Sequence, residues 1–306
     1  MKNMAFLFQG MGVDVRPLLS TLNEAQTEKI KTLCLKDPVL LKYQIKEYLF
    51  TFSENNKMIT EWLAVYTIGY VIYETYISKG YRPVFFVGYS LGLIVASACS
   101  GAVSFTDGAR MLIEIEKYRS LHTVENQTMA VIIGKSFQQI TSMIDRKKLN
   151  DMVYVAIDNN NDCVTLSGIE AGIDTILSMC VADGVIRAEK LKTRYAFHCP
   201  LGAAGIESFA HYINCLEVKD LSIPILSVYD QQMIDSSAKL KMELIRNMSS
   251  AMMWRTTILS IRDMGIEEFA EVGLDGGLTK ISRLIDLDLQ FTTIKKINRE
   301  ERFQRV

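Results

Sequence analysis

Short apolar runs that end at glycine alternate with longer segments of helical periodicity in the first part of the chain. The run MAFLF at 4–8 ends before Gly10, and the run PVFFVG at 83–88 ends in a glycine, so both predict buried strands that lead into loops. The longer apolar segment 60–79 predicts a buried helix that Thr60 opens. Further helical patterns cover residues 15–50, 91–100 and about 107–121.

Residues 128–194 show a different pattern, in which strand-like and helical runs follow in the order strand, helix, two strands, helix, strand. The two middle strands, VYVAID and DCVTLSG, flank a polar turn of asparagines at 159–161, and the second helix closes on Gly184. This βαββαβ order is the ferredoxin-like arrangement. We therefore predict an α/β protein with a large domain over 1–127 and 195–306 and an inserted ferredoxin-like subdomain over 128–194. Further strands of the large sheet are predicted over 223–230 and 267–273.

Composition and charge are those of an ordinary globular protein. The 306 residues are 49% hydrophobic and 23% charged, with a formal net charge of −1, so no overall basic field would attract nucleic acid or anionic lipid. The six cysteines have no metal-like spacing and the three histidines are dispersed, which argues against a metal site. The N-terminus lacks the pattern of a signal peptide, and no apolar run reaches the ~18 residues of a membrane helix. We expect a soluble, cytoplasmic protein that binds no metal, nucleic acid or membrane.

The segment VGYSLGLIV at 87–95 places Ser90 in a G-x-S-x-G frame between a predicted strand and a predicted helix. This context suits a nucleophile on a sharp turn, because small residues permit the turn and the helix N-terminus points N–H groups at the serine oxygen. A small residue packed where a strand meets a helix would give the same letters. A serine nucleophile also needs a base. His122 and His211 have the patterns of structural or solvated residues, so we favour His198, at the loop where the chain returns from the insertion.

Five blocks of the sequence occur in an order and spacing that resemble the malonyl-CoA:acyl carrier protein transacylase family. They are FLFQGMG at 6–12, GYSLG at 88–92, GAVSFTDGARML at 101–112, YAFHCPL at 195–201 and FAEVGLDGGLT at 269–279. The resemblance covers essentially the whole chain. It implies an α/β-hydrolase-like large domain, a ferredoxin-like subdomain and an active site in the cleft between them. It also identifies Ser90 as the nucleophile and His198 as the general base of a ping-pong acyl transfer.

The same resemblance implies roles for backbone groups and for partners. The N–H groups of Met11 and Leu91 would hold the oxyanion, and the carbonyl of Met253 would orient the histidine. No bound cofactor is implied, because the acyl groups arrive as thioesters of coenzyme A (acyl-CoA) or of the 4′-phosphopantetheine of an acyl carrier protein.

Basic residues just before the histidine loop are candidates for docking this acidic carrier protein. They are Lys190, Lys192 and Arg194. A solvated basic strand end would explain the same residues equally well.

One position near the nucleophile departs from the family pattern in a way that bears on the substrate. Counting 25 residues on from Ser90 gives the place of the arginine that holds the free carboxylate in malonyl-selective members, and this chain has Ile115 there. Loss of that charge-assisted pair should greatly weaken malonyl selection. Arg119, one turn later on the same helix face, would reach the pocket only after a shift.

Other positions around the serine depart from the family in the same direction. Tyr89 replaces the usual histidine and Met11 the usual glutamine, while Phe197 after Tyr195 combines residues of malonyl-type and methylmalonyl-type members. We therefore expect an apolar, adaptable acyl pocket. Its predicted lining is Met11, Tyr89, Ile115 and Phe197.

The functional expectation is a serine acyltransferase that acts on acyl thioesters of acyl carrier protein with an uncharged, non-malonyl acyl group, in polyketide or fatty-acid biosynthesis. A hydrolase that removes stalled acyl chains from carrier proteins would use the same Ser90–His198 pair with water as the acceptor, and the sequence does not separate the two. Malonyl transfer would need another cation in the pocket. A non-catalytic docking protein would be expected to have lost Ser90 or His198, and both remain.

Overall fold

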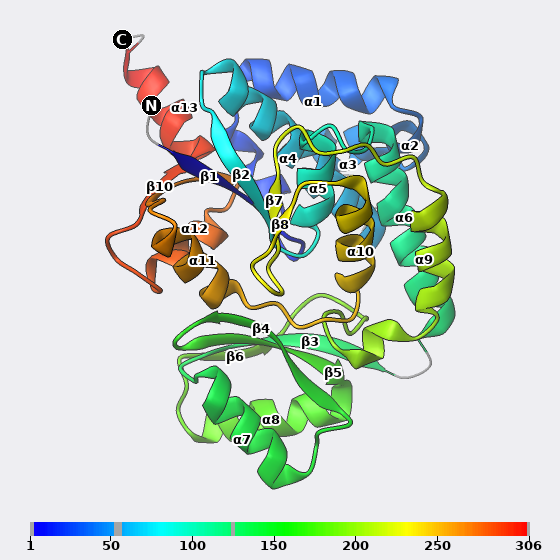
Figure 1. Cartoon of the computed structure of the whole chain (residues 1–306), viewed down its shortest axis with the longest axis vertical. Helices are drawn as coiled ribbons and strands as arrows, with labels where there is room; N and C mark the ends of the chain where they lie inside the picture. The colour runs from blue at the N-terminus through cyan, green and yellow to red at the C-terminus, as the bar shows by residue number, and fades with distance from the viewer. Residues whose placement is uncertain (1–2, 52–56, 124–125, 305–306) are drawn as a thin grey trace.

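The computed structural model describes residues 3–51, 57–123 and 126–304. Figure 1 shows a larger α/β part above and a smaller part, built on a four-stranded sheet, below it. The chain leaves the larger part once, forms the smaller part, and returns to complete the larger one.

The larger part is built around a six-stranded sheet in the order β10-β9-β1-β2-β7-β8. The strands are β1 (Met4–Phe8), β2 (Pro83–Gly88), β7 (Ile225–Leu226), β8 (Met233–Ile234), β9 (Glu268–Val272) and β10 (Gln290–Thr293). β1 pairs in parallel with β2 and with β9, and all of its side chains are buried, as is typical of a central parallel strand covered on both faces. β7 and β8 pair antiparallel at one end of the sheet. The strands predicted at 4–8 and 83–88 are confirmed.

Helices surround this sheet (Figure 1). They are α1 (Glu24–Lys36), α2 (Pro38–Lys42), α3 (Ile45–Phe50), α4 (Met58–Ser78), α5 (Gly92–Cys99), α6 (Phe105–His122), α9 (Ile206–Cys215), α10 (Ser237–Arg246), α11 (Trp254–Asp263), α12 (Gly277–Arg283) and α13 (Ile294–Gln304), with 3₁₀ helices η1 (Arg16–Thr21) and η2 (Pro200–Ala203). The prediction that Thr60 opens the long apolar helix is wrong. α4 already begins at Met58, and the Thr60 side chain is buried in the first turn, where it caps nothing.

The smaller part is an antiparallel sheet in the order β4-β5-β3-β6 with two helices on its outer face (Figure 1). Its elements are β3 (Gln127–Ile133), α7 (Phe137–Lys147), β4 (Val153–Asn160), β5 (Cys163–Ile169), α8 (Glu170–Ala182) and β6 (Arg187–Lys190). The predicted βαββαβ order is confirmed, and side chains such as Ile132, Ile140 and Val164 form a separate small core. The domain limits at 127/128 and 194/195 stay predictions.

The sequence pattern was less informative in the last third of the chain. The strand predicted over 223–230 is confined to Ile225–Leu226, because the chain turns back at Gln231, whose φ is 56°, and enters β8. The strand predicted over 267–273 is confirmed as β9. β10 was not among the predicted strands.

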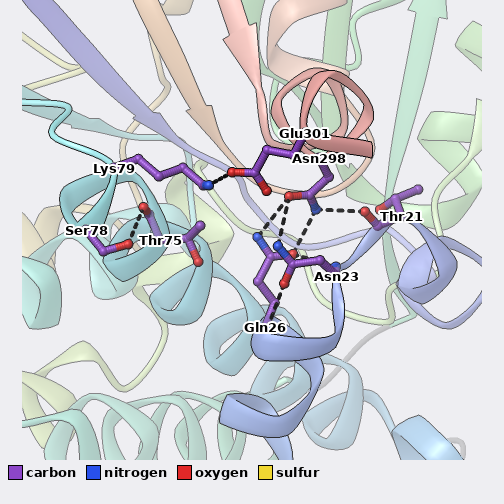
Figure 2. A network of polar contacts seen from close by, with 8 residues as sticks. All are labelled: Thr21, Asn23, Gln26, Thr75, Ser78, Lys79, Asn298 and Glu301. Atoms are coloured by element: carbon purple, nitrogen blue, oxygen red, sulfur yellow. Dashed lines mark hydrogen bonds and ion pairs between the residues drawn. The ribbon is translucent and has the colours of Figure 1, made fainter. Parts of the chain in front are cut away.

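Amide side chains fasten the last helix, α13, to the first part of the chain (Figure 2). Asn298 Nδ2 donates to Gln26 Oε1 at 2.8 Å and to the Thr21 carbonyl at 2.9 Å, and Gln26 Nε2 donates back to Asn298 Oδ1 at 3.3 Å. Glu301 adds an ion pair with Lys79, which follows α4. Because buried amides need partners, this reciprocal pairing fixes how the two ends of the chain meet.

Candidate active site

Ser90 lies on a sharp turn between β2 and α5, with its backbone in the left-handed region at a φ of 57°. The glycines on either side of it make this turn possible. A Cβ at Gly88 would stand 2.4 Å from the Cα of Leu93, and one at Gly92 would stand 2.1 Å from the carbonyl oxygen of Phe8. The G-x-S-x-G spacing is therefore a steric requirement of packing α5 directly against the ends of β1 and β2.

The turn brings Ser90 to His198. Ser90 Oγ and His198 Nε2 are 2.8 Å apart, and both residues are buried. His198 also has a left-handed backbone, with a φ of 57°, and its N–H donates to the carbonyl of Met248 at 3.1 Å. The arrangement matches a serine whose proton a neighbouring imidazole can accept.

The surroundings of His198 keep the imidazole neutral. Burial lowers the pKa of His198 to about 4, and the nearby carbonyls of Asn247 and Ser250 oppose this decrease only in part. Among the residues that the structure describes, no acceptor meets hydrogen-bond geometry with Nδ1. The prediction that Met253 orients the ring is wrong: Met253 is the N-cap of α11, and its carbonyl accepts from the N–H and the hydroxyl of Thr257.

The two residues predicted to supply the oxyanion donors both lie at the cavity beside Ser90. Met11 and Leu91 line the cavity at the serine, and within the described ranges neither N–H donates a hydrogen bond. The loop that carries Met11 packs closely on the turn, since a Cβ at Gly10 would stand 2.8 Å from the carbonyl oxygen of Tyr89. These positions suit the predicted oxyanion donors.

The cavity beside Ser90 is small and apolar. Its volume of about 10 Å³ is just enough to hold one water molecule. The apolar side chains around it come from the Met11 loop, from α4, α5 and α6, and from the segment before His198. They are Met11, Trp62, Ile94, Leu112, Ile115 and Phe197, and Leu91 and Met248 also line the cavity. None of the described lining residues is an aspartate, glutamate, lysine or arginine.

Three of the four residues predicted to line the acyl pocket are brought together here: Met11, Ile115 and Phe197. Tyr89 is not among them. Its ring packs edge-on against Trp254 with centroids 5.2 Å apart, and its hydroxyl donates to Asn159 Oδ1 of β4 at 2.8 Å. Tyr89 therefore lies against the smaller sheet, so its placement in the pocket is corrected.

Arg119 does not enter the cavity either. Its guanidinium is fully buried and donates to the carbonyls of Leu201 at 3.1 Å and Ala196 at 3.2 Å, and to Gln127 Oε1 at 2.7 Å. These two carbonyls flank His198 on both sides. Arg119 thus ties α6 and β3 to the histidine segment and is not directed at the place of the missing carboxylate-binding arginine.

Asn247 and Trp62 also belong to this site, although no sequence pattern indicated either of them. Asn247 Nδ2 donates to the Ser90 carbonyl at 3.3 Å, and its Oδ1 accepts from the Tyr229 hydroxyl at 2.6 Å. Its position just after α10 gave no local signal. Trp62 lies in a helix that is apolar on nearly every face, so periodicity could not indicate its direction.

The predicted docking residues differ in their surroundings. Lys190 forms ion pairs with Glu170 and Asp174, each at 2.7 Å, and Arg194 pairs with Glu116 at 3.0 Å. Lys192 is exposed and has no ion pair within the described part of the chain.

Neither of two features of other protein classes occurs among the described residues. No helix there has the length and apolar character to cross a membrane. No three His, Cys, Asp or Glu side chains come together in a way that could hold a metal ion.

Residues 25–282 match the family model of the acyl transferase domain. The chain is 28% identical over 291 residues to the malonyl CoA-acyl carrier protein transacylase of Synechocystis sp., which covers 94% of this chain and 93% of that protein. Its structure is similar to the acyl-carrier-protein S-malonyltransferase of Burkholderia pseudomallei, with a TM-score of 0.87 at 21% identity over 99% of this chain and 100% of that one. It is also similar to a malonyl-transacylase in complex with a type II PKS acyl-carrier protein, with a TM-score of 0.81 at 20% identity over 98% and 100% of the two chains. The predicted α/β-hydrolase-like domain with a ferredoxin-like insertion is confirmed.

Proposed function

Because the chain belongs to the acyl transferase domain family, we propose that it transfers an uncharged acyl group between coenzyme A and acyl carrier protein thioesters through an acyl-Ser90 intermediate. The observation that carries this proposal is Ile115, which lines the cavity at Ser90 together with other apolar side chains. The relatives named for malonyl transfer support the reaction class. That the acyl group is uncharged is inferred from the apolar lining of the cavity in this chain.

The geometry supports a two-step mechanism. Neutral His198 accepts the Ser90 proton as Oγ attacks the thioester carbonyl, and the N–H groups of Met11 and Leu91 hold the developing oxyanion. The thiolate leaves and takes up the proton from the imidazolium, which leaves an ester on Ser90. In the second step His198 accepts the proton of the incoming carrier thiol and the sulfur attacks the ester. The Ser90 oxygen then leaves and takes the proton back from the imidazolium, which restores the free serine and neutral His198.

A carboxylate on the acyl group would be poorly accommodated. Burying an anion among apolar side chains costs several kcal/mol unless a cation or several donors hold it. The nearest arginine on the same helix, Arg119, already donates to the carbonyls around His198. An acyl group such as acetyl needs no such partner.

Intact-mass measurement tests the proposal. The protein is mixed with acetyl-CoA or malonyl-CoA, and mass added to Ser90 is followed before and after addition of carrier protein bearing a free phosphopantetheine thiol. We expect rapid acetylation, transfer to the carrier, and no adduct in Ser90→Ala. Rapid malonyl loading would contradict the uncharged acyl group. Release of free acid from acyl-carrier protein, with no transfer to an acceptor thiol, would replace the transferase with the editing hydrolase.

A further inference from the structure

Trp62 of α4 stands directly against the catalytic cavity. Its side chain is buried and packs edge-on against Phe197, with ring centroids 5.9 Å apart and an interplanar angle of 64°. Both rings line the cavity that contains Ser90 and His198. Of the apolar side chains there, the indole of Trp62 is the largest.

A second, much larger cavity of about 790 Å³ is open to solvent and is lined by residues of α4, of α6 and of the segment before His198, and by Tyr43. From α4 it is lined by Met58 and Ile59, from α6 by Glu116, and from the segment before the histidine by Thr193 and Arg194.

The two cavities follow one another along these segments. On α4, Met58 and Ile59 precede Trp62 by one helical turn and therefore share its face. On α6, Ile115 lines the small cavity and its neighbour Glu116 lines the large one. Trp62 and Phe197 line only the small cavity, whereas residues one turn before Trp62 on α4 and next to Ile115 on α6 line the large one.

From this arrangement we infer that Trp62 is a specificity-determining residue that restricts the acyl group on Ser90 to short chains such as acetyl and propionyl. The inference rests on the proposed function, since it concerns the acyl group of the same intermediate. A water-sized space accepts a methyl group, and a longer chain that grows away from Ser90 meets the indole. Because packed interiors yield little, such a chain would have to displace the Trp62–Phe197 pair.

The test measures how the rate of Ser90 acylation depends on chain length. Acyl-CoA thioesters from acetyl to octanoyl are compared by intact mass in the parent protein and in Trp62→Leu and Trp62→Ala. In the parent we expect acetyl to load faster than hexanoyl by about tenfold or more, since a pocket discriminates methylenes on this scale. In Trp62→Ala, where loss of the indole enlarges the small cavity, we expect that ratio to fall by about tenfold or to reverse.

A ratio within one variant does not depend on how much of the protein is folded, so partial loss of stability leaves the test intact. Met58→Ala is the matched control, because it enlarges only the outer cavity and should leave the ratio unchanged. Equal loading of acetyl and hexanoyl in the parent, or an unchanged ratio in Trp62→Ala, would overturn the inference.

p-Nitrophenyl acetate, butyrate and hexanoate serve as carrier-free acyl donors for the same series. If no thioester loads Ser90 but the esters show the chain-length dependence and its loss in Trp62→Ala, the proposed function fails and the size limit stands. If the thioesters load without any dependence on Trp62, the size limit fails and the proposed function stands.

Discussion

Ser90 and His198 both have a left-handed backbone with a φ of 57°, yet different parts of the molecule hold them in it. Ser90 is held mainly by its sequence neighbours, because Gly88 and Gly92 let α5 pack on the strand ends, and Asn247 adds one distant hydrogen bond to its carbonyl. His198 is held by distant residues, with Arg119 of α6 bonded to carbonyls on both sides of it. The position of Ser90 thus depends mainly on residues close to it in sequence, and the position of His198 on residues far from it. We therefore expect Ser90 and His198 to be disturbed by different mutations.

Replacing Gly92 by alanine disrupts the turn that carries Ser90, and we expect it to have the largest effect on stability and on the reactivity of Ser90. The alanine Cβ would stand 2.1 Å from the carbonyl oxygen of Phe8, so helix and strand would have to separate. We expect a loss of stability of about 3 kcal/mol or more and no labelling of Ser90 by a fluorophosphonate probe. Thermal unfolding and intact mass measure the two effects. Gly80→Ala, at a φ of 86° with open space around it, should lose less stability and label normally. Labelling of Gly92→Ala at the parent rate would contradict the steric argument.

The same difference explains what the sequence could predict. The strands at 4–8 and 83–88 and the turn at Ser90 depend on residues that are close in sequence, so apolar runs and glycine spacing were enough to locate them. The hydrogen bond from Tyr89 to Asn159 spans 70 residues, and that from Arg119 to Ala196 spans 77. Nothing near either residue indicates such a partner.

Errors at the site have the same origin. Tyr89 was predicted to line the acyl pocket because it is next to the nucleophile, but its side chain packs on Trp254 and bonds to Asn159. The histidine-orienting carbonyl was assigned to Met253, although the nearby carbonyls belong to Asn247 and Ser250 after α10. A position counted through an ungapped helix, Ile115, was placed correctly beside the cavity, since helical geometry preserves register.

The pH dependence of stability tests how fully the imidazole of His198 is buried. Burial lowers the pKa of His198 from 6.5 to about 4, so between these values the unfolded chain binds the proton and the folded protein does not. Stability from this group is complete above about pH 6.5 and is lost as the pH falls toward 4, by about 3 kcal/mol in all. Urea unfolding of the parent and of His198→Gln at pH 7 and pH 4.5 measures it. We expect the parent to lose more stability than the variant, and equal losses would mean that the imidazole is not desolvated.

Placing a charge in the cavity beside Ser90 and His198 tests where the acyl group lies. Ile115→Arg should supply a partner for a malonyl carboxylate and penalise apolar acyl groups by burying a cation. We expect the ratio of kcat/KM for malonyl-CoA to that for acetyl-CoA to rise by about a hundredfold, the equivalent of ~3 kcal/mol. Initial rates of Ser90 loading give the ratio. Leu121→Arg, on an exposed part of the same helix, is the control. An unchanged ratio would mean that the acyl group does not contact Ile115.

Replacing Arg119 removes hydrogen bonds that position the His198 segment, although Arg119 does not contact the reacting atoms. Arg119→Met leaves the Ala196 and Leu201 carbonyls without their donor, so the His198 ring should lose its alignment with Ser90. We expect kcat to fall by about tenfold or more, with KM changed by less than about twofold. Arg119→Lys should not restore kcat, because one ammonium cannot reproduce the fork of the guanidinium.

Two comparisons separate this positioning role from general stability. Tyr118→Phe removes the hydroxyl bond from the same helix to the carbonyl of Gly202, the residue after Leu201. It should lower the melting temperature while kcat stays near the parent value. If Arg119→Met and Tyr118→Phe lose stability and kcat in the same proportion, Arg119 has no specific effect on His198.

We expect the smallest effect from mutations at Lys192, in the exposed segment before His198. Lys192 has no ion pair among the described residues, whereas Lys190 and Arg194 are each paired with acids, so an acidic carrier protein would meet Lys192 at the lowest cost. We expect Lys192→Glu to raise KM for acyl-carrier protein about threefold, with the difference shrinking as salt is added. KM for acyl-CoA and the rate with p-nitrophenyl acetate should not change, because His198, at the inner end of the segment, is held by Arg119. Lys192→Gln should show a smaller increase. If Lys192→Glu leaves KM for the carrier unchanged at low salt, the carrier docks elsewhere and the basic residues before the histidine are a solvated strand end.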